Sequence, residues 1–98
     1  MSFYVYILRC ADGSYYTGHT DDLTTRLEAH RTGTFRGYTY SRRPVRLVFQ
    51  QEFGSRDEAF MAERQITGWS RQKKEALIRG DWPSLRRLSQ PHGSTGSP

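Results

Sequence analysis

With 98 residues, the chain has room for one domain and none for a second. Fifteen Lys and Arg side chains outnumber ten Asp and Glu side chains, and thirteen of the fifteen are Arg, whose planar guanidinium matches phosphate oxygens. This excess, beside two Trp, six Tyr and five Phe, favours a nucleic-acid partner. The single cysteine, Cys10, excludes an internal disulfide, and no Cys/His cluster has zinc spacing. Because we find no leader and no long apolar run, we expect a cytoplasmic protein without a membrane span.

Two strands are predicted at the start of the chain. Residues 3–10 carry apolar side chains on both faces, which is typical of a central strand. A turn signal follows, and residues 15–19 form the second strand.

The length of the turn decides where two tyrosines point. A two-residue turn at Asp12-Gly13 would place Tyr6 and Tyr16 on opposite faces of the sheet. A three-residue loop at 11–13, with its glycine in the left-handed conformation, would place Tyr6 opposite Gly18 and both tyrosines on one face. If the two tyrosines share an active site, the three-residue loop is the one expected.

The rest of the chain predicts one more strand and four helices. Asp21 or Asp22 starts the first helix, which runs to about Thr32 and is followed by a polar, aromatic and basic loop at 33–43. The third strand covers 45–52 and packs mainly through one face, that of Val45, Leu47 and Phe49. The other helices begin at the capping box of Ser55 and Glu58, at Ser70, and at Asp81, and they end near Thr67, Arg79 and Leu88.

These elements predict an α+β fold, a small α/β sandwich. Its three-stranded sheet, mixed or antiparallel, has flanking helices. Residues 1–88 form the domain, and the Ser-, Gly- and Pro-rich segment 89–98 is expected to be a disordered tail.

The first helix carries Arg26 and His30 with i, i+4 spacing, so both lie on one face. Leu23 and Leu27 mark the core side of this helix. Arg26 and His30 are therefore expected at the edge of the buried stripe. The alternative is an ordinary edge cation whose stem covers apolar surface.

Glu63 is predicted to lie among apolar residues on its helix, in the inward stripe of Ala59, Ala62 and Ile66. A buried carboxylate needs a cation, a metal or a proton, because an unpaired one costs several kcal/mol, on the order of known buried-charge penalties. One interpretation is a structural ion pair with Arg26. The other is a ligand for a hard cation, since Mg²⁺ is commonly held by one or two carboxylates with water and phosphate.

The order of these residues resembles the GIY-YIG endonucleases over about residues 3–80. The resemblance is closest to the small stand-alone bacterial members, and the stretches 62–66 and 69–78 are long enough to be specific. The name-giving triplets differ here: Gly-Ile-Tyr is Tyr4-Val5-Tyr6, and Tyr-Ile-Gly is Tyr16-Thr17-Gly18. The positions that carry the resemblance are Tyr6, Tyr16, Gly18, His19, Arg26, His30 and Glu63.

The resemblance implies hydrolysis of phosphodiester bonds with a single Mg²⁺ or Mn²⁺ ion held by Glu63. It implies that Arg26 stabilises negative charge on the phosphate, and that a tyrosine accepts a proton from water. We favour Tyr16 as the base and Tyr6 as its positioning partner, with His19 and His30 as supports; the reverse assignment of the tyrosines stays open. A Tyr pKa near ~10 must be lowered, or its proton relayed, for this role.

The basic loop is the expected nucleic-acid surface, with a merely solvated loop as the alternative. Its candidate residues are Arg36, Tyr38, Tyr40, Arg42 and Arg43. The expected substrate is DNA, with RNA open, cut with low sequence specificity according to structure, single strands or damage, in DNA repair or processing. We expect no organic cofactor, and a monomer or weak homodimer. A non-catalytic nucleic-acid-binding module and a basic interaction protein are the alternative functions.

Overall fold

The computed structural model describes residues 1–89. Their contacts form two compact units, Met1–Gly68 and a second unit that begins at Trp69. Residues 90–98, which make up all but the first residue of the predicted tail, lie outside the described part of the chain. The single domain at 1–88 stays a prediction.

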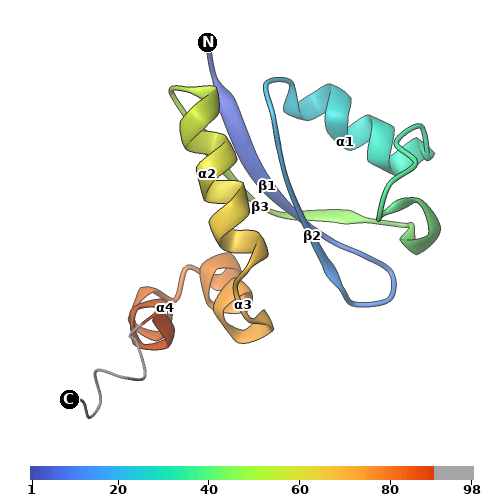
Figure 1. Ribbon diagram of the computed structural model, residues 1–98. Coiled ribbons are helices and arrows are strands. Elements are labelled where there is room, and N and C mark those ends of the chain that lie inside the picture. Colours follow the sequence, from blue (N-terminus) through green and yellow to red (C-terminus); the bar gives the residue numbers. More distant parts are fainter. Residues whose placement is uncertain (90–98) are drawn as a thin grey trace. The chain divides into compact units, whose positions relative to one another are not determined.

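A three-stranded antiparallel sheet forms the centre of the first unit (Figure 1). Its strands are β1 (Phe3–Arg9), β2 (Tyr15–Thr20) and β3 (Arg46–Phe53), in the order β2-β1-β3. The central position of β1 confirms the prediction from its two-sided apolar pattern. Val5 through Leu8 are fully buried there. With its helices, the chain has the predicted α+β fold.

The hairpin between β1 and β2 closes over a three-residue loop, 11–13, because the Cys10 backbone donates to the Ser14 carbonyl at 2.8 Å, as expected if the two tyrosines share a face. Its glycine has a φ of 86°, and Tyr6 pairs with Gly18 across the two strands. Because Gly18 and Tyr16 are two residues apart on β2, Tyr6 and Tyr16 point to the same face of the sheet. The turn therefore places both phenol groups in position to share one site.

β3 departs from the predicted one-sided packing. It pairs Phe49 with Ile7 and Leu47 with Leu8, with a register shift between the two pairs. Ile7 and Leu8 are adjacent on β1 and point to opposite faces, so Phe49 and Leu47 do too. The prediction was wrong because Val48 is an extra residue that breaks the alternation, as in a β-bulge.

Side-chain caps begin the two helices of the first unit. Helix α1 (Leu23–Thr32) starts at Asp22, whose carboxylate accepts a hydrogen bond from the backbone of Thr25, and it ends at Gly33, with a φ of 83°. Helix α2 (Arg56–Thr67) starts at Ser55, whose hydroxyl accepts from the backbone of Glu58. Both starting points were predicted from these residue types. A short 3₁₀ helix, Tyr40–Arg42, lies in the loop before β3.

Helices α1 and α2 lie on either side of the sheet (Figure 1). Tyr6, on the face it shares with Tyr16, contacts His30 of α1. His19 lies next to Gly18 on β2, so its side chain points to the other face, where it meets Glu63 of α2. β2 is an edge strand, and side chains from both helices meet around it.

The second unit consists of helix α3 (Arg71–Arg79) and helix α4 (Trp82–Ser89), which pack on each other. Ser70 caps α3, and Gly80 ends it with a φ of 69°, as predicted. No helix among residues 1–89 has the length and apolar character needed to cross a membrane.

Candidate active site

A chain of hydrogen bonds links β1, α1 and the loop that follows α1. The Tyr6 hydroxyl lies 3.0 Å from His30 Nε2, and His30 Nδ1 lies 2.7 Å from Thr39 Oγ1. All three side chains are fully buried. The predicted edge position of His30 was therefore wrong. The last turn of α1 packs its inner face on the tyrosine side of the sheet, and partners on both ring nitrogens make this burial possible.

His30 is neutral at ordinary pH. Burial, and then the charge of Arg26, lower the pKa of His30 to about 4. A neutral imidazole donates through one nitrogen and accepts through the other. If Tyr6 donates to Nε2, then Nδ1 donates to Thr39; in the other tautomer both directions reverse. The Thr39 hydroxyl can either donate or accept. The tautomer of His30 therefore sets the direction of both its hydrogen bond to Thr39 and its hydrogen bond to Tyr6.

The two tyrosines are held in their protonated form. Burial raises the pKa of Tyr6 well above its usual range, with a further contribution from Tyr16. Burial also raises the pKa of Tyr16, and the negative charge of Glu63 adds to this effect. Arg26 lowers the pKa of both tyrosines, but less strongly. A positive charge near Glu63 would remove part of the effect that keeps Tyr16 protonated.

Gly18 makes room for both tyrosine rings. A Cβ atom at this position would lie 2.5 Å from the Tyr6 hydroxyl oxygen and 3.1 Å from a ring carbon of Tyr16. Tyr6 is fully buried and hydrogen-bonded, so its phenol has little freedom to move away. The glycine of the Tyr16-Thr17-Gly18 triplet is thus required by the packing of the site.

Glu63 pairs with His19. His19 Nδ1 donates to Glu63 Oε1 at 2.5 Å, and the two side chains are 24% and 25% exposed. This contact takes the place of the ion pair with Arg26 that was one of the two interpretations, because α2 packs on the face of the sheet to which His19 points. Glu63 is also partly open to solvent rather than enclosed in the apolar stripe. Its carboxylate is accessible to a cation.

Glu63 suits a hard cation that keeps most of its water. Among residues 1–89, no group of three or more His, Cys, Asp or Glu side chains is placed to form a metal cage. Mg²⁺ needs no such cage, since one carboxylate, water and substrate phosphate commonly complete its shell. A partly exposed carboxylate whose charge reaches both tyrosines fits that requirement.

Part of the basic loop reaches the site. The ring of Tyr38 stacks on Tyr16, with centroids 6.0 Å apart and planes 22° apart. The Arg42 guanidinium lies 3.8 Å above Tyr38 and also binds Asp12 of the hairpin loop, at 3.1 Å. Tyr38 and Arg42 are thus next to the catalytic candidates, and their part in binding nucleic acid stays a prediction.

The other three loop candidates form a separate stack. Arg36 and Arg43 lie 4.4 and 4.8 Å from the ring centre of Tyr40. Arg43 also donates to the Tyr40 carbonyl. These contacts give the three residues a role in shaping the loop, and their part in binding nucleic acid stays a prediction.

Three further residues lie near the site, and two of them, Thr39 and Phe60, were not predicted as part of it. Thr39 binds His30, Phe35 lies edge-on to His30 at 4.5 Å, and Phe60 lies edge-on to His19 at 5.5 Å. Phe60 could have been found, because it lies three residues before Glu63 on the same helix. Thr39 is in a loop, where spacing gives no such signal, and Phe35 is one of the aromatic residues of the basic loop.

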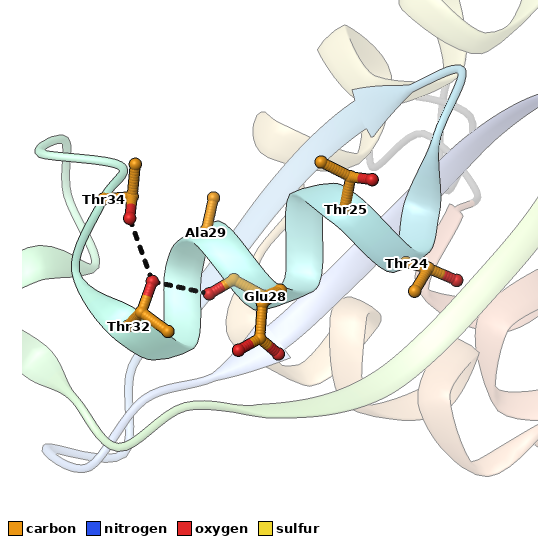
Figure 2. Close-up of a pocket in the computed structure, with 6 residues that line it drawn as sticks. All are labelled: Thr24, Thr25, Glu28, Ala29, Thr32 and Thr34. Carbon is orange, nitrogen blue, oxygen red and sulfur yellow. Dashed lines mark hydrogen bonds between the residues drawn. The ribbon is translucent and has the colours of Figure 1, made fainter.

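A hollow of about 430 Å³ on α1 shares no residue with the candidate site (Figure 2). In Figure 2 the Thr32 hydroxyl donates to the Glu28 carbonyl and lies 3.0 Å from the Thr34 hydroxyl. These contacts stabilise the end of the helix, and we assign the hollow no function. Its lining is Thr24, Thr25, Glu28, Ala29, Thr32 and Thr34.

The family model of the GIY-YIG catalytic domain matches residues 2–76, which include every residue of the site. The chain belongs to the GIY-YIG family. This family is part of a superfamily of nucleases. The side chains that carried the resemblance in the sequence are therefore those that the fold gathers around β2.

Relatives from several bacteria are similar over most of this GIY-YIG chain. A UPF0213 protein of Staphylococcus aureus (strain Mu3) is 45% identical over 78 residues, covering 80% of this chain and 95% of the relative. The solution NMR structure of the UPF0213 protein BH0048 from Bacillus halodurans has a TM-score of 0.54 and 41% identity, covering 93% of this chain and 100% of that one. The protein EF2693 from E. faecalis has a TM-score of 0.58 and 35% identity, covering 94% and 93%. Their names specify no activity.

Proposed function

We propose that this protein is a metal-dependent endonuclease that hydrolyses phosphodiester bonds in DNA. The observation that carries the proposal is the meeting of two sets of side chains around edge strand β2. Tyr6, Tyr16 and His30 come from one face of the sheet, and the His19–Glu63 pair comes from the other. Together with Arg26, they offer a carboxylate, a fixed cation and phenol groups to one phosphate.

Glu63 is the residue that would hold a single Mg²⁺ or Mn²⁺ ion. When bound, such an ion polarises the scissile phosphate and stabilises the leaving 3′ oxygen. In this proposal His19, bonded to Glu63 Oε1, orients the carboxylate.

Arg26 would stabilise the charge that develops on the phosphate oxygens. Its side chain is half-buried, and its charge already affects Tyr6, Tyr16 and His30. A fixed guanidinium in a partly desolvated site needs little reorganisation during the reaction.

Exposure supports Tyr16 rather than Tyr6 as the group that takes the proton from water. Tyr6 is fully buried, so an attacking water cannot contact its hydroxyl, whereas Tyr16 is only partly buried. Tyr16 must first release its own phenol proton to solvent; Arg26 lowers its pKa, and a cation at Glu63 would remove the charge that raises it. Tyr6 and His30 then act as positioning residues, because they hold the aromatic face on which Tyr16 lies. Tyr6 and Tyr16 have ring centres 6.3 Å apart, and Tyr16 and His30 have ring centres 5.2 Å apart.

The proposal also covers the substrate and the place of the protein in the cell. We place the protein in the cytoplasm, in DNA repair or processing, and expect it to cut DNA with low sequence specificity. We expect it to act as a monomer or weak homodimer and to need no organic cofactor.

Cleavage of labelled single-stranded, duplex and branched DNA tests the proposal. Wild-type protein should cut at least one form in Mg²⁺ or Mn²⁺, and EDTA should stop the reaction. If it binds DNA with a steep salt dependence but cuts none of the three forms in either metal, the non-catalytic binding module is the correct reading instead.

A further inference from the structure

Two exposed aromatic rings lie beside the candidate active site. Phe60 on α2 is 42% exposed and lies 5.5 Å from the ring of His19. Tyr38 in the loop after α1 is 41% exposed and stacks on Tyr16. Each ring contacts a proposed catalytic residue. Phe60 has apolar ring surface available for a ligand. Tyr38 stacks on Tyr16 and has the Arg42 guanidinium 3.8 Å from its ring centre, so a base would pack on this ring by taking the place of Arg42.

Each exposed ring has an arginine next to it. The Arg64 guanidinium carbon lies 5.7 Å from the ring centre of Phe60, and that of Arg42 lies 3.8 Å from the ring centre of Tyr38. An aromatic ring offers a stacking surface to a nucleobase, and a neighbouring arginine can bind the adjoining phosphate. The same combination therefore occurs twice around the site.

The two ring–arginine pairs lie on opposite sides of β2. Tyr16 and His19 are three residues apart on this strand, so their side chains point to opposite faces and their backbones are roughly 10 Å apart. Tyr38 contacts the first and Phe60 the second. A nucleotide chain that crosses the edge of β2 would meet Tyr38 on one side of the strand and Phe60, with Glu63, on the other.

We propose that Phe60 and Tyr38 are base-stacking platforms that make the site selective for single-stranded DNA. This inference rests on the proposed function and names the form of its substrate. In a duplex each base is already stacked and paired, so its flat face cannot pack on a protein ring without unstacking. In a single strand that face is available. The arginines beside the rings would hold the backbone on either side of the cleaved bond.

Binding in EDTA, measured by fluorescence anisotropy, tests the platforms separately from cleavage. The probes are a labelled oligothymidylate, an abasic strand of equal length, and a hairpin duplex. Phe60→Leu and Tyr38→Leu keep apolar contacts but remove the rings. Met61→Ala is the matched control, because Met61 is the next residue on α2 and is 68% exposed. Phe60→Trp restores a ring and should restore binding.

Each Leu variant should bind the oligothymidylate roughly 5- to 100-fold more weakly than wild type, in line with the usual loss of one stacked base. The Leu variants should bind the abasic strand and the hairpin duplex as tightly as wild type does. Met61→Ala should bind all three probes as tightly as wild type does. An unchanged affinity for the oligothymidylate would overturn the platforms, and so would an equal loss on the abasic strand. Ring-dependent binding without any cleavage would support this inference and reject the nuclease. Cleavage by a protein whose affinity for the oligothymidylate does not depend on the rings would support the nuclease and reject the platforms.

Discussion

The Tyr6 hydroxyl and His30 Nε2 lie 3.0 Å apart in a region that no solvent reaches. This contact joins the central strand of the sheet to α1, and Thr39 completes it from the loop. The hydrogen bonds that position the tyrosines are therefore also part of the core. Changes to them should affect stability and cleavage together.

Gly18→Ala should destabilise the protein and reduce cleavage. The added methyl group would lie 2.5 Å from the Tyr6 hydroxyl oxygen. Overpacking of this kind costs roughly 1–3 kcal/mol. Thermal or urea unfolding measures the change. Gly54→Ala is the control, because nothing lies within 4 Å of its added carbon, and it should change stability by about 0.5 kcal/mol or less. Equal stability of the two variants would contradict the packing role of Gly18.

Thr39→Val and Thr17→Val should have different effects on the free energy of unfolding, although both remove a buried hydroxyl. Thr39→Val leaves His30 Nδ1 without its partner, which should cost roughly 1–3 kcal/mol. Thr17 Oγ1 is buried without a hydrogen-bond partner, so its replacement should be neutral or stabilising. Denaturant unfolding of both variants gives the comparison. A Thr17→Val protein less stable than Thr39→Val would be inconsistent with the buried hydrogen-bond chain.

Stability should fall as the pH drops from about 6.5 to about 4. The pKa of His30 is lowered to about 4 in the folded protein, whereas an unfolded His titrates near ~6.5. Between these values the unfolded chain binds a proton that the folded protein does not, so acid favours unfolding. Neutral His30 makes its full contribution above pH 6.5.

His30→Gln isolates this effect from the carboxylates, which titrate in the same range. The difference in unfolding free energy between wild type and variant should shrink by up to about 3 kcal/mol on going from neutral pH to below 4. NMR of the His30 ring protons gives the midpoint directly. Titration near 6.5 in the folded protein would show that His30 is not held neutral by burial.

Arg26→Ala should reduce kcat by roughly 10²- to 10³-fold, the usual effect of removing one group that stabilises transition-state charge. DNA binding should change little. Arg26→Lys keeps the charge but loses the planar fork, so it should recover only part of the rate. Arg31→Ala is the control on the same helix, because Arg31 is 64% exposed and pairs with Glu28. Wild-type turnover by Arg26→Ala would remove Arg26 from the mechanism.

Local patterns in the sequence predicted the strands and helices, and the condition that Tyr6 and Tyr16 share one site selected the register of the first hairpin. Side chains alternate between the two faces along each strand. Of the two loops considered, only the three-residue loop with a left-handed glycine puts Tyr6 and Tyr16 on the same face. The caps at Asp22 and Ser55 were likewise predicted from side chains that act on backbone three residues away.

Contacts between distant segments could not be predicted in the same way. The partner of Glu63 is His19, 44 residues away, and it depends on which face of the sheet α2 covers. The burial of His30 depends on Thr39, a loop residue without a periodic signal. The bulge at Val48 leaves an ordinary apolar run in the sequence, so the break in alternation was not visible there.

The most direct test of the account compares metal-dependent DNA cleavage by wild type, Glu63→Gln and Asp57→Asn. Asp57 is an exposed carboxylate on the same helix as Glu63 and lies outside the site. Glu63→Gln keeps the size of the side chain but removes the charge that would hold the cation. Wild type and Asp57→Asn should cut DNA at similar rates in Mg²⁺ or Mn²⁺, and Glu63→Gln should not cut. Cleavage by Glu63→Gln at the wild-type rate would contradict the assignment of Glu63 as the residue that holds the metal.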